Sequence, residues 1–113
     1  MNLDKFQWEV GKWGEATFPR ATPEGITAHL LEEALELYGV ANDDIPELLA
    51  IAAERRTDTV GNLEEAADCF ILLLHLFHHK AASISTFARW KMQINRERVW
   101  RPNEEPAGHV KHL

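Results

Sequence analysis

The chain has 113 residues, of which 45% are hydrophobic and 27% charged. This length and composition predict one globular domain, residues 1–113, with its own hydrophobic core. Twelve Lys and Arg against eighteen Asp and Glu give a net charge of −6, which argues against a protein that grips duplex nucleic acid by its phosphates. The longest purely apolar run, residues 69–74, is too short to cross a bilayer, and no signal peptide opens the chain. We therefore expect no membrane association.

The apolar spacing predicts helices and no strands, so the expected fold is all-α, a bundle of four to five helices. Thr22-Pro23 is typical of a helix start and Gly39 of a helix end. The tail at residues 102–113 contains two prolines and a glycine and is expected to be irregular. The expected helices span residues 3–17, 23–38, 46–53, 63–79 and about 83–100.

The helix at residues 63–79 is apolar around nearly its whole circumference, which predicts that it lies buried among the others. Its one cysteine, Cys69, is then a buried thiol, as expected for a protein of the reducing cytoplasm. Yet the same helix carries Glu65 and Asp68 beside its apolar residues. Carboxylates are rarely buried without a cation, so these two acids call for a positive partner.

A second acidic pair, Glu33 and Glu36, has the same three-residue spacing on the helix at 23–38. Residues three apart are neighbours on a helix surface, so two such helices side by side would present four carboxylates. Oxygen ligands of this kind suit Mg²⁺ or Mn²⁺. Two alternatives stay open: the acids only solubilise helix edges, or Glu65 forms a capping box with Asn62.

Three histidines, His75, His78 and His79, end the central helix with a spacing that permits metal binding. Polar coverage of a helix end is the interpretation that we favour for them. A di-iron carboxylate site needs Glu-x-x-His on two helices, and the chain contains no such motif.

The last helix carries Lys91, Asn95 and Arg98 in one column that is expected to face inward. Arg offers a planar fork of donors to a phosphate, and Lys a compact charge. One alternative is that these cations pair with the acids within the chain. Combined with a bound Mg²⁺, the column instead predicts a metal–phosphate site.

The segments HLLEEALEL, NLEEAADCFILLL and KMQINRERVW together resemble the MazG-like all-α nucleoside triphosphate pyrophosphohydrolases. The family pattern is E-x-x-E, then E-x-x-D, then K…N…R. The opening FQWEVGKWGEATFP and the ending GHVKHL are similar to one subgroup, the phage and bacterial dATP/dGTP diphosphohydrolases. His112 matches a histidine of that ending, without a role that we can derive. The matching metal-binding acids are Glu33, Glu36, Glu65 and Asp68, and the matching nucleotide-contacting residues are Lys91, Asn95 and Arg98.

The resemblance implies Mg²⁺-dependent hydrolysis of a (deoxy)nucleoside triphosphate to the monophosphate and pyrophosphate, with Mn²⁺ as a possible substitute. It also implies a homodimer or homotetramer whose sites lie near the subunit interface, so that dimerisation completes the bundle. Glu36 is our preferred general base. Four more residues are candidates for base or sugar contacts, although each also suits a core or cap position: Trp13, Thr17, Phe18 and His29.

Two other functions fit the same sequence. One is a catalytically silent helical module that dimerises or binds a protein partner, in which the acids pair with Lys91 and Arg98. The other is a related pyrophosphohydrolase that acts on phosphoribosyl-ATP or on a modified nucleotide.

Overall fold

The computed structural model describes residues 2–101 and 111–112, with side chains for residues 2–100. Over these residues the predicted all-α class is confirmed. The helix that was expected to end at Ala53 continues to Arg55, and the last helix ends three residues before Trp100. The helices are α1 (Leu3–Thr17), α2 (Pro23–Tyr38), the 3₁₀ turn η1 (Asn42–Asp44), α3 (Ile45–Arg55), α4 (Leu63–His79) and α5 (Ile84–Glu97).

Side-chain caps fix where the helices begin. The Thr22 hydroxyl accepts a hydrogen bond from the Gly25 amide at 3.1 Å, and Pro23 occupies the first turn of α2. The Asn62 side chain accepts from the Glu64 amide at 2.9 Å at the start of α4. Each cap satisfies an amide that the helix itself leaves without a partner. Gly39, with φ of +96°, ends α2 in the left-handed conformation that glycine adopts without strain.

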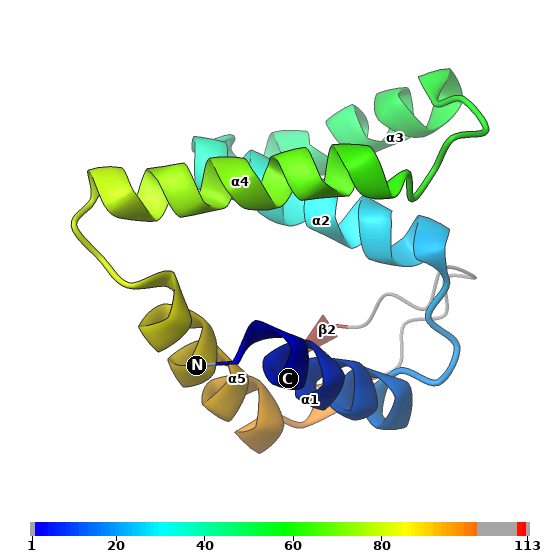
Figure 1. Ribbon diagram of the computed structural model, residues 1–113. Coiled ribbons are helices and arrows are strands. Elements are labelled where there is room, and N and C mark those ends of the chain that lie inside the picture. Colours follow the sequence, from blue (N-terminus) through cyan, green and yellow to red (C-terminus); the bar gives the residue numbers. More distant parts are fainter. Residues whose placement is uncertain (1, 102–110, 113) are drawn as a thin grey trace.

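The helices form two groups, one of α2, α3 and α4 and the other of α1 and α5 (Figure 1). A cavity of about 410 Å³ lies between α2, α3 and α4, and a second of about 720 Å³ is lined by α2, α4 and α5. The rings of Phe77 and Phe87 meet at 5.6 Å between their centroids and join α4 to α5. The two groups are therefore connected by side-chain contacts as well as by the chain.

Three aromatic rings join α1 to the segment that follows α5. Trp13 lies 5.3 Å from Phe18 and 6.0 Å from Trp100, and Phe18 lies 5.2 Å from Trp100, all edge to face. The Trp100 indole N–H donates to the Asn95 carbonyl at 2.8 Å. Edge-to-face geometry is the favourable arrangement for such rings, so this cluster anchors α1 against the end of α5.

One short ladder departs from the purely helical expectation. The strands β1 (Trp100–Arg101) and β2 (Lys111–His112) pair antiparallel, with Trp100 opposite His112. Two residues per strand leave no alternating pattern for a sequence analysis to detect. The rest of the tail that was expected to be irregular, residues 102–110 and 113, lies outside the described residues.

The predicted burial of the central helix is wrong for the single chain. No residue of α4 is buried, and Cys69 is exposed rather than buried. Leu73, Leu76 and Phe77 line a cavity shared with neighbouring helices, whereas Leu72 on the other side is 67% exposed. The physical reason is that α4 has neighbours on one side only, although its sequence is apolar on more than one.

The interior of the single chain is small. Among the described residues, Ile45 and Met92 are the large apolar side chains that are buried. The chain exposes 9211 Å², about one and a half times the roughly 6,300 Å² expected of a compact monomer of its mass. No helix within residues 2–101 is both long and apolar enough to cross a membrane. The exposed large apolar side chains are spread over the faces of several helices.

Candidate functional site

The acids of α2 form a coupled pair. Glu33 and Glu36 are both exposed and lie one turn apart. The negative charge of Glu33 raises the pKa of Glu36 above its usual value of 4.5. Smaller contributions in the same direction come from desolvation of the Glu36 carboxyl group, from the negative charge of Glu32 and from a hydrogen bond with the Glu33 carboxyl group. Such a hydrogen bond needs one shared proton. A proton or a metal cation therefore relieves the repulsion between these two carboxylates.

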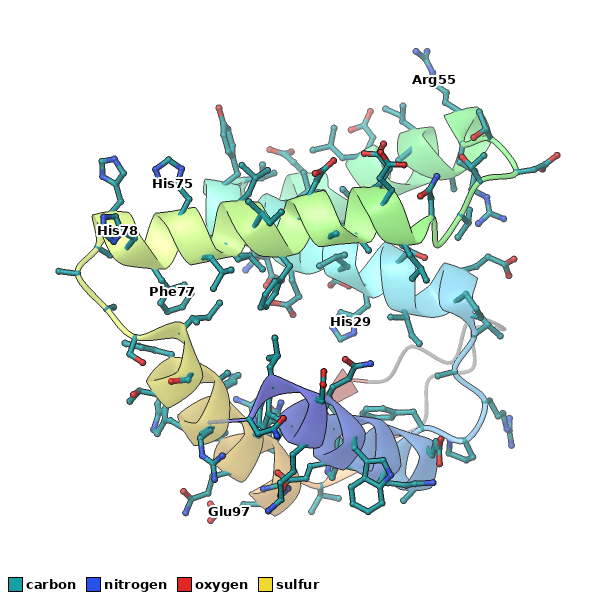
Figure 2. The ribbon with its side chains drawn as sticks, in the orientation of Figure 1. His29, Arg55, His75, Phe77, His78 and Glu97 are labelled. Atoms are coloured by element: carbon teal, nitrogen blue, oxygen red, sulfur yellow. The ribbon has the colours of Figure 1, made fainter. Side chains whose placement is uncertain are left out.

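His29 adjoins this pair on the preceding turn. Its Nε2 lies 3.4 Å from Glu33 Oε1, and its positive form opposes the rise in the pKa of Glu36. In Figure 2 the ring points from α2 toward α1, between the two groups of helices. His29 therefore lies beside the acids, where the sequence analysis placed a base or sugar contact, and its observed contact is to Glu33.

The acids of α4 occupy its first two turns. Glu65 lines the cavity between α2, α3 and α4, and Asp68 is exposed. The Asn62 amide already donates to the Thr59 carbonyl at 3.2 Å, so Glu65 is not needed as its capping partner. A capping box would need the Glu65 carboxylate to accept a hydrogen bond from the Asn62 amide, which already has a partner. The Glu65 carboxylate therefore stays available to a ligand.

The single chain does not gather the four acids. Within the described part of the chain, no group of three or more His, Cys, Asp or Glu side chains is close enough to hold a metal. Neither Glu65 nor Asp68 contributes to the pKa of Glu36, whose causes all lie on α2. The pair Glu33 and Glu36 still fits Mg²⁺ by its donor chemistry, because this ion is usually held by one or two carboxylates together with waters and substrate phosphates.

The predicted column on the last helix is only partly formed. Lys91 and Asn95 lie on α5, but Arg98 caps it in an extended conformation, with φ of −76° and ψ of 147°. Lys91 is exposed because the neighbouring Met92 takes the inward position. Asn95 is half-buried, and its amide nitrogen lies 3.9 Å from the Met92 sulfur. The expected inward position is therefore wrong for Lys91, whereas Arg98 is half-buried but lies beyond the helix that was expected to carry it.

The alternative of an ion pair between the cations and the acids finds no support at Lys91. Within residues 2–100, Lys91 makes no ion pair with any acid. Its ammonium is thus open to an anionic ligand.

Two of the candidate base-stacking residues have structural partners. Trp13 and Phe18 pack on each other and on Trp100, and Thr17 is half-buried at the end of α1. These contacts agree with the alternative given above for Trp13, Thr17 and Phe18, in which each residue has a core or cap position. His112 lies in β2, with its backbone paired to that of Trp100.

Sequence reasoning missed Arg56. It ends α3 and lines the same cavity as Glu65, together with Thr27 and Asn62. The only signal was the charged run Glu54-Arg55-Arg56, which is typical of a helix end. The cavity thus has both an acid and a cation on its lining.

Comparison with protein-family models, with curated proteins and with solved structures found no match. The resemblance to the MazG-like enzymes therefore depends on the three motifs alone. The helices at 23–38 and 63–79, which carry its acids, have the bounds expected from the sequence.

Proposed function

We propose that the protein is a Mg²⁺-dependent nucleoside triphosphate pyrophosphohydrolase that releases the monophosphate and pyrophosphate, with dATP or dGTP as candidate substrates. The observation that carries this proposal is the coupling of Glu33 and Glu36, two exposed carboxylates whose mutual repulsion raises the pKa of Glu36. Carboxylates in such a pair favour a divalent cation, and a cation bound there attracts a polyphosphate. The motif pattern in the sequence supplies the choice of reaction.

In this proposal Glu33, Glu36, Glu65 and Asp68 hold Mg²⁺, or Mn²⁺ in its place. Bound metal supplies charge neutralisation on the phosphate oxygens and a more acidic water. Glu36 is the proposed general base, because its carboxylate lies one turn from Glu33, beside the proposed metal site, where it can accept a proton from a water that the metal has made more acidic.

The cations of the last segment bind the phosphates. Lys91 is exposed and free of ion pairs within the described residues, and Arg98 carries the planar donor fork that suits phosphate. Asn95 adds an amide without adding charge. Trp13, Thr17, Phe18 and His29 are the proposed neighbours of the base and sugar.

The active form is proposed to be a homodimer or homotetramer acting in the cytoplasm. Support comes from the 9211 Å² of exposed surface and from the separation of the two acidic pairs within one chain. A second copy can bring additional oxygen ligands to a pair that has too few alone.

The test is incubation with a panel of deoxy- and ribonucleoside triphosphates and Mg²⁺, with identification of the products. We expect pyrophosphate and a monophosphate from at least one substrate and no product in EDTA. Glu36→Gln and Asp68→Asn should abolish turnover without loss of helix content, whereas the matched control Glu47→Gln on α3 should not. Turnover of phosphoribosyl-ATP or of a modified nucleotide alone would shift the assignment to that related enzyme.

A second candidate function is a catalytically silent helical module that dimerises or binds a protein partner. It is favoured by one observation, the exposure of Leu72 and other large apolar side chains on the surface of α4. This alternative predicts that Mg²⁺ with any nucleotide leaves the melting temperature unchanged. A melting shift together with turnover rejects it.

A further inference from the structure

The C-terminal end of α4 carries two histidines that the proposed catalytic function does not use. His75 and His79 are both exposed and lie one turn apart. Their rings are 5.6 Å apart between centroids and inclined by 52°, so they project from the same side of the helix. In Figure 2 His75 points away from α1 and α5, whereas Phe77 points toward α5. We call His75 and His79 the histidine pair.

Neither ring of the histidine pair is held by another group of the chain. Within residues 2–100, no hydrogen bond or ion pair involves the ring of His75 or of His79. His29 differs in this respect, because its Nε2 lies 3.4 Å from Glu33 Oε1. Each ring of the pair, when neutral, therefore keeps a nitrogen lone pair that can bind a metal ion.

The third histidine of this helix end does not join the pair. His78 precedes His79 by one residue, which turns its side chain by about 100° around the helix axis. No group of three His, Cys, Asp or Glu side chains in the described part of the chain is close enough to hold a metal. A metal on the histidine pair would therefore have two protein ligands, with water in its other positions.

The distance between the two rings fits a shared metal ion. A metal–nitrogen bond of about 2.1 Å puts the ion about 3.2 Å from the ring centre, and bond angles of roughly 90–110° then place the two centres about 4.6–5.3 Å apart. The observed 5.6 Å exceeds that range by about 0.3 Å. Because both side chains are exposed, a small rotation about their χ angles closes this difference.

We propose that the histidine pair binds a divalent transition-metal ion, Zn²⁺, Ni²⁺ or Cu²⁺, at a site separate from the proposed Mg²⁺ site. Imidazole nitrogen suits these ions, whereas Mg²⁺ is bound by oxygen ligands, and Cu²⁺ should bind most tightly of the three. Two histidines four residues apart on one helix face are a recurring arrangement for zinc. The pair thus has the metal-binding function that its spacing permits, in place of polar coverage of the helix end.

The electrostatics of the helix end favour a cation. The histidine pair lies in the last two turns of α4, where the carbonyl groups and the helix dipole give partial negative charge. Lys80, the next cation along the chain, lines the cavity on the same side as Phe77 and not on the side of the pair. One turn before His75 lies the apolar Ile71, so that neighbour brings no charge to repel the ion.

A bound ion acts on a strained turn. Ala81 has φ of +54°, a left-handed conformation that glycine adopts more readily. Its amide donates to the His78 carbonyl, and the Ala82 amide donates to the Phe77 carbonyl, each at 3.0 Å. These two bonds close α4 in a Schellman motif that has alanine at the position preferred by glycine. An ion that links two residues one turn apart holds the last turn helical, and so stabilises the end from which the chain passes to α5.

The test is calorimetric titration of the tag-free full chain with Ni²⁺ in the presence of excess Mg²⁺. His75→Ala and His79→Ala should each weaken Ni²⁺ binding by about tenfold or more, because one of two chelating side chains is lost. The matched control is His78→Ala, which removes a histidine from the same helix end and should leave the affinity unchanged. Ni²⁺ should also raise the melting temperature of the natural chain and of His78→Ala, but not of the other two variants. Circular dichroism checks that all variants keep their helix content.

Three results would overturn the proposal. One is a natural chain that binds Ni²⁺ no more tightly than the double variant His75→Ala/His79→Ala. Another is a His78→Ala variant that loses as much affinity as the variants of the pair. The third is loss of the Ni²⁺ site in Glu36→Gln, because the ion would then occupy the carboxylates of α2. No measurement here uses a nucleotide, so failure of this proposal is distinguishable from failure of the catalytic one.

Discussion

Glu33 and Glu36 lie one turn apart on α2, and the charge of Glu33 raises the pKa of Glu36. Helix geometry alone brings the two side chains together. The pair is therefore preformed before any ligand arrives, and its electrostatic cost falls when a proton or a metal ion binds. This relationship gives two predictions, one for pH and one for Mg²⁺.

The first prediction concerns pH. The pKa of Glu36 is higher in the folded chain than its usual 4.5, so the folded state holds its proton longer than the unfolded state. By linkage, this carboxyl lowers stability as the pH rises from about 4.5 through the raised pKa, and the loss persists above that range. Glu36→Gln should remove this decline. Urea unfolding midpoints between pH 4 and 7 measure it, with Glu54→Gln on α3 as the control. An unchanged pH profile in Glu36→Gln would show that the coupling has no thermodynamic effect.

The second prediction concerns Mg²⁺ in the absence of substrate. A cation bound by Glu33 and Glu36 should raise the melting temperature of the natural chain. At a Mg²⁺ concentration about ten times the dissociation constant, the free energy of unfolding should rise by about 1.4 kcal/mol. Glu33→Gln and Glu36→Gln should each lose most of that gain. NaCl at matched ionic strength controls for general screening. Equal shifts in Mg²⁺ and in NaCl would contradict a specific site.

The third prediction compares two glycines. Gly39 has φ of +96°, so Gly39→Ala should destabilise the chain by about 1 kcal/mol through backbone strain. Gly11 lies inside α1, and an added Cβ would meet nothing within 4 Å. Gly11→Ala should therefore stabilise by about 0.5–1 kcal/mol through higher helix propensity. Chemical denaturation of the two variants measures both changes. Effects of equal sign would contradict the assigned conformations.

The fourth prediction concerns the aromatic cluster. Trp100→Ala removes two edge-to-face contacts and the hydrogen bond to the Asn95 carbonyl, and should cost about 3 kcal/mol. Trp100→Phe keeps a ring and loses the hydrogen bond, which should cost about 1 kcal/mol. Urea denaturation followed by circular dichroism measures both. If Trp13→Ala weakens nucleotide binding but leaves stability unchanged, the cluster is a base platform and not a packing unit.

The parts of the fold that depend on local chemistry could be predicted from the sequence. Thr22 and Gly39 bound α2 as expected, because a hydroxyl cap and a left-handed glycine act within a few residues. The pairing of Glu33 with Glu36 also follows from spacing alone. Local rules fail at Arg98, where the helix ends earlier because the chain turns to pair Trp100 with His112.

The burial of individual side chains on α4 could not be predicted from the sequence, because an apolar helix face can be covered either by the same chain or by another molecule. The pattern of α4 predicts contacts on several sides, and the single chain supplies them on one. Cys69 and Leu72 are exposed for this reason. Whether the acids of α2 and α4 meet depends on the same question, since spacing fixes each pair on its own helix but not the distance between helices.

Ile45 and Met92 are the large apolar side chains that the described part of the chain buries, and this scarcity affects how the protein denatures. A subunit with so few internal contacts derives part of its stability from association. Unfolding and dissociation should then form a single equilibrium. Dilution alone would lower the melting temperature, so the cellular abundance of the protein sets the fraction that is folded.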